Sequence, residues 1–133
     1  MKALLDTNVI VSGIFFGGTP GRILSAWRSG SFILVASPLI LEEYRRVALE
    51  FARGLSSFDV ANILDLITIH AEVVGDHPLG ASVCRDPHDD KFLACGLVAG
   101  ATLVSGDKDL LAVDGAMGVS VLSPRAFLTK LAR

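Results

Sequence analysis

The sequence predicts a three-layer α/β/α fold with a central, mostly parallel sheet, formed by one domain over residues 1–133. The first observation behind this prediction is an alternation of short apolar runs with longer stretches of helical periodicity, the pattern of βαβ units. The second is size and composition, since 133 residues of which 51% are hydrophobic suit one compact core. This composition also excludes a disordered chain.

Five short apolar segments are expected to form the strands. The first is Ala3-Leu4-Leu5, which ends at Asp6, and the second, at residues 32–35, is followed by Ser37-Pro38. Both have the length and unbroken apolar character of strands that are buried on both faces. The remaining candidates are residues 71–74, 102–104 and 119–122.

Helical patterns lie between these strands, and three of the helices are expected to start at a hydroxyl residue followed by proline. A hydroxyl side chain at the N-cap and proline at the first helical position form a favourable start. The three pairs are Thr19-Pro20, Ser37-Pro38 and Ser123-Pro124. The expected helices span residues 8–14, 20–29, 38–53, 57–70, 88–100 and 124–131.

Charge and hydropathy exclude several classes of protein. The net charge of −2 argues against a broadly basic nucleic-acid binder, although a local basic patch is compatible with it. No apolar run approaches the roughly 18 to 20 residues that span a bilayer, and the N-terminus does not read as a signal peptide, so we expect a cytoplasmic protein without membrane association. Cys84 and Cys95 form no CxxC motif and are expected to be buried, reduced thiols.

Three aspartates stand at the start of the helix expected at residues 88–100. Asp86, Pro87 and Asp89 form a start that resembles a capping box, which accounts for two of the acids. Asp90 is the surplus acid and leads directly into an apolar run. On its own, Asp90 is most simply a surface acid that favours the helix dipole.

The helix at residues 38–53 discriminates between two neighbouring glutamates. At 100° per residue, Glu42 points away from the apolar arc, whereas Glu43 falls about 40° beyond the edge of that arc. Glu43 therefore lies at the boundary of the buried face. It is either a rim residue paired with Arg45 or Arg46, or an acid that points into a crevice, and the sequence leaves both alternatives open.

Asp6 and Asp107 each follow an expected buried strand. In open α/β sheets the carboxyl ends of the strands form the ligand crevice, although each acid could instead cap the next helix. Asp6, Glu43, Asp90 and Asp107 together occupy positions from which they can converge. Such crowding raises the pKa values of the carboxylates unless a cation is present, and oxygen-only ligands favour Mg²⁺ or Mn²⁺ over zinc.

Four motifs in this order resemble the PIN-domain ribonucleases, most of all the toxin-type PIN proteins of prokaryotic toxin–antitoxin systems. They are Leu-Leu-Asp-Thr-Asn-Val-Ile at 4–10, Ser-Pro-Leu-Ile-Leu-Glu-Glu-Tyr at 37–44, Asp-Pro-His-Asp-Asp-Lys-Phe-Leu-Ala at 86–94 and Leu-Val-Ser-Gly-Asp-Lys-Asp-Leu-Leu at 103–111. The resemblance runs from residue 1 to about residue 112 and so covers nearly the whole chain.

Carried over by motif, the four acids of the family fall on Asp6, Glu43, Asp90 and Asp107, as both catalytic residues and metal ligands. The resemblance further implies auxiliary roles for Asn8, Ser105 and Asp109. Lys91 and Lys108 are candidates for steering the RNA backbone.

The resemblance implies a ribonuclease that hydrolyses RNA phosphodiester bonds with Mg²⁺ or Mn²⁺ and is the toxin of a toxin–antitoxin pair. A protein antitoxin and a homodimer are the partners it implies, and Phe15, Phe16 and Trp27 are candidate contact residues, although Trp27 fits core packing better. Two rival functions are a non-catalytic interaction module and a Mg²⁺-dependent phosphohydrolase that acts on nucleotides. The absence of a second aspartate two positions after Asp6 argues against the common phosphatase route.

Overall fold

The computed structural model describes residues 1–53 and 58–133, and its centre is a sheet of five parallel strands. The strand order is β3-β2-β1-β4-β5, and every neighbouring pair is parallel. The strands are β1 (Lys2–Leu5), β2 (Ile33–Ala36), β3 (Glu72–Val73), β4 (Thr102–Val104) and β5 (Val121–Leu122). All five predicted strands are thereby confirmed, with small shifts at their ends.

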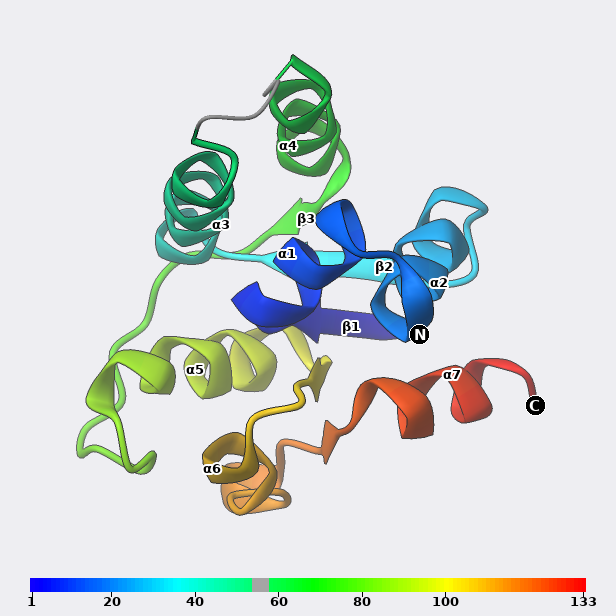
Figure 1. The fold of residues 1–133 in the computed structure, drawn as a ribbon. Helices are drawn as coiled ribbons and strands as arrows, with labels where there is room; N and C mark the ends of the chain where they lie inside the picture. The colour runs from blue at the N-terminus through cyan, green and yellow to red at the C-terminus, as the bar shows by residue number, and fades with distance from the viewer. Residues whose placement is uncertain (54–57) are drawn as a thin grey trace.

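Helices cover both faces of this sheet, which confirms the three-layer α/β/α prediction. Helices α3 and α4 lie on one side and α5 on the other (Figure 1), while α7 packs against α2 and β5. The helices are α1 (Thr7–Phe15), α2 (Gly18–Arg28), α3 (Pro38–Phe51), α4 (Phe58–His70), α5 (Asp90–Ala99), α6 (Lys108–Leu111) and α7 (Pro124–Leu131). Two 3₁₀ turns, η1 (Pro87–Asp89) and η2 (Ala116–Gly118), complete the elements.

The core consists of the central strands and the inner faces of the helices. Leu4, Leu5, Leu34 and Leu103 have no exposed surface, as expected of parallel strands covered on both faces. The chain runs from β1 outward to β2 and β3 and then returns to β4 on the other side of β1. The chain therefore adds strands outward from β1 in one direction and then, from β4 on, in the other, while all strands stay parallel. Such a switch point leaves a crevice at the carboxyl ends of the strands.

Two of the three predicted hydroxyl–proline starts are confirmed, and one is wrong. The hydroxyls of Ser37 and Ser123 accept hydrogen bonds from the first turns of α3 and α7. Helix α2 instead begins at Gly18, with Gly17 as its N-cap, so Thr19 lies inside the first turn. The reason is that Gly17 adopts a φ of 72°, which lets the chain turn into the helix earlier, and proline is tolerated anywhere in a first turn that has free N–H groups.

The remaining differences concern helix ends and very short elements. The helices predicted at residues 38–53 and 88–100 end at Phe51 and Ala99. The predicted start of α4 at residue 57 lies outside the described residues. Within the described ranges no single helix is long and apolar enough to cross a bilayer. Only α1 and α2 taken together, with a bend of 94° between them, have that length and apolar composition.

Tyr44 fixes α3 against the first strand. Its side chain is fully buried, and its hydroxyl donates a hydrogen bond to the backbone carbonyl of Leu5. Burial, followed by the negative charge of Asp6, raises the pKa of Tyr44 well above its usual value, so the phenol stays protonated. This bond places the preceding residue, Glu43, beside the carboxyl end of β1.

Candidate active site

Asp6 and Asp107 lie at the carboxyl ends of the two strands that flank the switch point. The backbone N–H of Asp6 donates to the carbonyl of Val104 at 2.9 Å, which ties the end of β1 to the end of β4. Each carboxylate also caps the next helix: Asp6 accepts from the N–H of Asn8 at 3.2 Å, and Asp107 accepts from the N–H of Asp109 at 2.8 Å. Capping and convergence, which the sequence left as alternatives, therefore coexist.

Ser105 joins these two acids. Its side chain is completely buried, its hydroxyl donates to Asp6 Oδ2 at 2.6 Å, and its oxygen accepts from the N–H of Asp107 at 3.0 Å. Burial raises the pKa of Asp6, and the hydrogen bonds from Ser105 and Asn8 oppose that rise. The charges of Asp107 and Glu43 raise the same pKa further, as expected of carboxylates near the crevice at the carboxyl ends of the strands.

Glu43 points into this space and is held there by two partners. Thr7, the residue after Asp6, donates its hydroxyl proton to the Glu43 carboxylate. The ammonium of Lys91 lies 2.7 Å from Glu43 Oε1 and also donates to the carbonyl of His88 at 2.6 Å. The side chains of Lys91 and Glu43 are only 19% and 20% exposed, so this ion pair is largely shielded from water.

The helical geometry predicted from the sequence is confirmed for the two glutamates. Glu43 lies at the boundary of the buried face, whereas Glu42 is exposed. The alternative pairing with Arg45 does not occur, because Arg45 bonds to Asp65 at 2.8 Å. Glu43 is therefore the crevice acid rather than a solvated rim residue.

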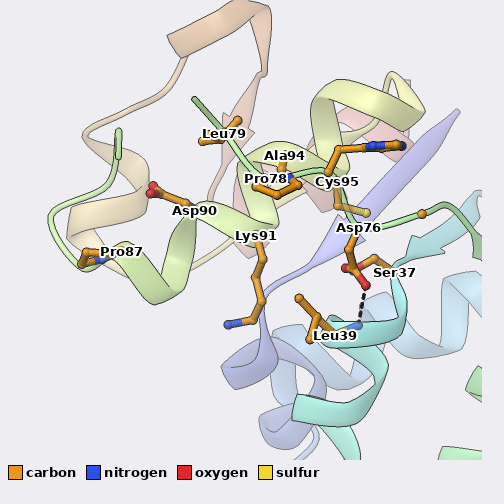
Figure 2. Close-up of a pocket in the computed structure, with 12 residues that line it drawn as sticks. Ser37, Leu39, Asp76, Pro78, Leu79, Pro87, Asp90, Lys91, Ala94 and Cys95 are labelled. Carbon is orange, nitrogen blue, oxygen red and sulfur yellow. Dashed lines mark hydrogen bonds between the residues drawn. The ribbon is translucent and has the colours of Figure 1, made fainter. Parts of the chain in front are cut away.

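Asp89 and Asp90 have surroundings that differ from those expected from the sequence. The Asp90 carboxylate accepts hydrogen bonds from the N–H groups of Val83 and Cys84, at 3.2 and 2.8 Å. These bonds lower the pKa of Asp90 against the opposing effect of burial. Figure 2 shows the side chains of Asp90 and Lys91 pointing in different directions from α5.

Asp89 is half-buried, and the charges of other acids reach it. Its side chain makes no capping hydrogen bond, contrary to the capping box expected from the sequence. Burial, followed by the charges of Asp86, Asp6 and Asp107, raises the pKa of Asp89 to about 6. The physical reason for the difference is the 3₁₀ turn η1, which advances the backbone by a larger angle per residue than an α-helix and so changes the direction in which Asp89 points. Asp86 caps this turn as predicted, by accepting from the N–H of His88 at 3.0 Å.

The auxiliary residues predicted from the sequence have unequal positions. Asn8 contributes its backbone N–H rather than its side chain, which is exposed. Asp109 lies 3.8 Å from Arg85, at the edge of the site, and Lys108 is exposed. The sequence reasoning missed Thr7, although a hydroxyl residue directly after the acid at a strand end is a signal that could have found it.

Oxygen atoms dominate the donor set that surrounds the crevice. Asp6, Glu43, Asp89 and Asp107 offer only carboxylate oxygens, and these suit a hard divalent cation. As the side chains stand in the described residues, no three acidic, histidine or cysteine groups lie close enough together to hold a metal ion. The chemistry of these residues therefore fits such an ion. Because Glu43 is bonded to Lys91 and Asp6 to Ser105, binding of the ion requires the side chains to rearrange.

Comparison with known proteins places this arrangement in a family. The family model described as "PIN domain" matches residues 2–109. The chain belongs to the PIN domain family. PIN domains are typically nucleases and usually depend on divalent metals, which agrees with an acidic crevice at the switch point of a parallel sheet.

Two individual proteins are similar to this PIN domain. "Uncharacterized protein MJ1680" of Methanocaldococcus jannaschii is 29% identical over 118 residues, which cover 85% of this chain and 75% of that protein. The crystal structure of PAE2754 from Pyrobaculum aerophilum superposes with a TM-score of 0.68 at 17% identity, covering 99% of this chain and 90% of that chain. The second likeness establishes the fold.

Proposed function

We propose that this PIN domain is a ribonuclease that hydrolyses RNA phosphodiester bonds with Mg²⁺ or Mn²⁺. The observation that carries the proposal is the position of Asp6 and Asp107 at the strand ends beside the switch point, with Glu43 and Asp89 on neighbouring elements; burial raises the pKa values of Asp6 and Asp89, and the charges of nearby acids raise them further. Crowded carboxylates without a counter-ion oppose folding, and a divalent cation would remove that cost. Asp90, which the resemblance suggested as the third ligand, is replaced in this proposal by Asp89.

In this mechanism the four acids would hold the metal, which would supply an activated water and neutralise charge that develops on the phosphate. Ser105 and Thr7 hold Asp6 and Glu43 near the crevice through hydrogen bonds, and Glu43 would leave Lys91 when it takes part in holding the metal. Lys91, beside Glu43, supplies a positive charge within reach of an RNA backbone. Products with 5′-phosphate and 3′-hydroxyl ends follow from the family resemblance.

The direct test is cleavage of mixed-sequence single-stranded RNA by the purified full chain in Mg²⁺, in Mn²⁺ and in EDTA. The proposal requires cleavage with either metal and none in EDTA. Asp6→Asn removes a ligand charge with little change in shape and should abolish cleavage, while circular dichroism confirms that this variant is folded. Undiminished cleavage in EDTA, or an active Asp6→Asn protein, contradicts the proposal.

A non-catalytic interaction module is a second candidate, because the ammonium of Lys91 can neutralise Glu43 by itself. An internal cation of this kind could stabilise the fold of a protein that never binds a divalent ion. Titration of the purified protein with Mn²⁺ separates the two functions, because a module of this kind should show no saturable binding.

We further propose that the protein acts in the cytoplasm as the toxin of a type II toxin–antitoxin pair, bound by a protein antitoxin and present as a homodimer. The toxin-type motifs support the pair. Phe16, 71% exposed, and Phe51, 46% exposed, stack edge to face at 5.5 Å, and Phe15 packs on Phe51, which provides an apolar contact surface. Trp27 packs partly against the core, in line with the expectation for it. Light scattering and co-expression with the neighbouring gene product test both partners.

A further inference from the structure

A pocket of about 280 Å³ opens beside the acidic crevice, between the start of α3, the segment at residues 75–79 and α5 (Figure 2). Its walls are mainly apolar side chains, among them Leu39, Pro78, Leu79 and Ala94. Ligand pockets in proteins commonly combine such walls with a few polar groups that orient the ligand. The acids of the crevice do not line this pocket, so the catalytic proposal leaves it without a role.

The pocket is continuous with the side of the crevice that carries Glu43. A second hollow, of about 320 Å³, is lined by Glu43, Arg46 and His88. Leu39, Pro87 and Lys91 line both hollows, so the two hollows are neighbours, and we treat them as the two ends of one groove. Its basic groups gather at the end near Glu43, where a phosphate would lie, and the pocket forms the other end.

The polar residues that line the pocket include Asp76, His77, Asp90 and Lys91, and among them Asp76 disfavours a phosphate and favours a hydrogen-bond donor. Asp76 lines the pocket, and one of its carboxylate oxygens accepts a hydrogen bond from the N–H of Leu39 at 3.3 Å. The other oxygen has no protein partner among the described residues. A carboxylate repels an anion but accepts hydrogen bonds from amino groups. The ligand that combines a flat apolar body with an exocyclic amino group, attached to a phosphate chain, is a nucleobase.

We propose that this pocket binds one unpaired base of the RNA next to the cleaved phosphate, with Asp76 as the specificity-determining residue. This inference rests on the proposed ribonuclease function for its substrate class. Single-stranded RNA presents bases that are free to enter such a pocket, where their edges are read by hydrogen bonds. Cytosine, adenine and guanine carry an exocyclic amino group that can donate to Asp76, whereas the exocyclic groups of uracil are carbonyl oxygens, which a carboxylate repels, and only its ring N–H can donate. The pocket therefore disfavours uracil.

The test compares the full-length protein's binding of cytidine and uridine, which differ at one position of the base by an amino group or a carbonyl oxygen. Neither probe has a phosphate, so binding is measured without cleavage, by chemical-shift changes in NMR titrations. Cytidine should bind about tenfold more tightly than uridine, the factor expected of one net hydrogen bond. The amides that shift should be those of the pocket, such as Leu39, Leu79 and Cys95.

Two variants and a control make the assignment specific. Asp76→Asn offers amide donors that suit the uridine carbonyl, so the preference for cytidine should disappear. Leu79→Trp fills the pocket and should weaken both nucleosides. Asp59→Asn, an exposed acid in the first turn of α4, removes the same charge elsewhere and should change neither affinity.

Cut-site sequencing of mixed RNA provides the second measurement. Wild type should show a depletion of uracil at one fixed position beside the cut, and Asp76→Asn should lose that depletion. Equal affinities for the two nucleosides, no binding up to their solubility limits, or shifts confined to other surfaces overturn the pocket inference even if RNA is cleaved. Selective cytidine binding by a protein that cleaves no RNA would overturn the ribonuclease function and leave the base pocket standing.

Discussion

Loss of the ion pair between Lys91 and Glu43 should lower the stability of the protein and raise its affinity for a metal ion. Lys91→Met keeps the length of the side chain and removes its charge. The ammonium makes two hydrogen bonds, at 2.7 Å to Glu43 and 2.6 Å to the carbonyl of His88. Because both side chains of the pair are about four-fifths buried, solvent weakens the interaction less than it does on the open surface.

The magnitude follows from these contacts. A hydrogen bond that involves a charged group contributes roughly 1.5–3 kcal/mol, so the metal-free variant should lose about 2 kcal/mol of unfolding free energy. For a domain of this size such a loss lowers Tm by roughly 5–10 °C. A metal ion that recruits Glu43 must first break the pair, so the same energy should reappear as tighter Mn²⁺ binding, by roughly tenfold or more.

Thermal unfolding with and without Mn²⁺, together with calorimetric titration of Mn²⁺, measures both effects. The stability deficit should shrink when Mn²⁺ is saturating, because the metal then neutralises Glu43. Lys130→Met, an exposed lysine on α7, controls for the loss of one positive charge and should change neither quantity. A variant with unchanged Tm, or one that binds Mn²⁺ no more tightly than wild type, refutes the idea that Lys91 and a metal compete for Glu43.

Three further predictions concern the acids of the crevice. Glu43→Gln should weaken Mn²⁺ binding in calorimetric titrations and Glu42→Gln should not, so equal titration curves would reject the assigned orientation. Asp89→Asn should abolish RNA cleavage, and Asp90→Asn should retain it. Asp90→Asn should lose about 1 kcal/mol of unfolding free energy, because its bonds to the N–H groups of residues 83 and 84 become weaker. The reverse pattern in the cleavage assay would restore Asp90 as the ligand. The two acids should also have opposite effects on how stability depends on pH. The pKa of Asp89 is raised to about 6, so this carboxyl binds protons more tightly in the folded protein than in the unfolded chain. Its ionisation therefore lowers stability as the pH rises from about 4 to 6. The pKa of Asp90 is lowered, so its contribution is present above the unfolded pKa and is lost as the pH falls. Denaturant unfolding of the two Asn variants across this range, without metal, checks the signs.

The fold could be predicted from the sequence because each strand is a separate apolar run with a clear end. The runs before Asp6 and Ser37 fix two central strands, and such signals are local. The elements that escaped prediction are α6 and the two 3₁₀ turns, which have three or four residues each. Segments of that length show no measurable periodicity, so only the surrounding structure defines them.

The candidate site was predictable where local rules decide orientation. Glu43 was located because fourteen residues of α3 establish which face is buried, and Asp6 and Asp107 because a strand end fixes their place. The choice between Asp89 and Asp90 stays a prediction for the cleavage assay, because it depends on whether one turn is 3₁₀ or α, a difference that single residues do not encode. The bonds that Thr7 and Lys91 make to Glu43 join segments distant in sequence, and sequence patterns do not reveal such pairs.

The case for a metal rests on charge that the protein leaves uncompensated rather than on a preformed cage. Of the four carboxylates, Glu43 has a lysine partner, and the hydrogen bonds from Ser105 and Asn8 leave the pKa of Asp6 raised. A protein that needs only its fold would gain stability by replacing such acids, since crowded carboxylates oppose the charged state. Repulsion between these carboxylates therefore favours the binding of a cation. Mn²⁺ should accordingly raise the free energy of unfolding, and this effect can be measured without knowing the RNA substrate.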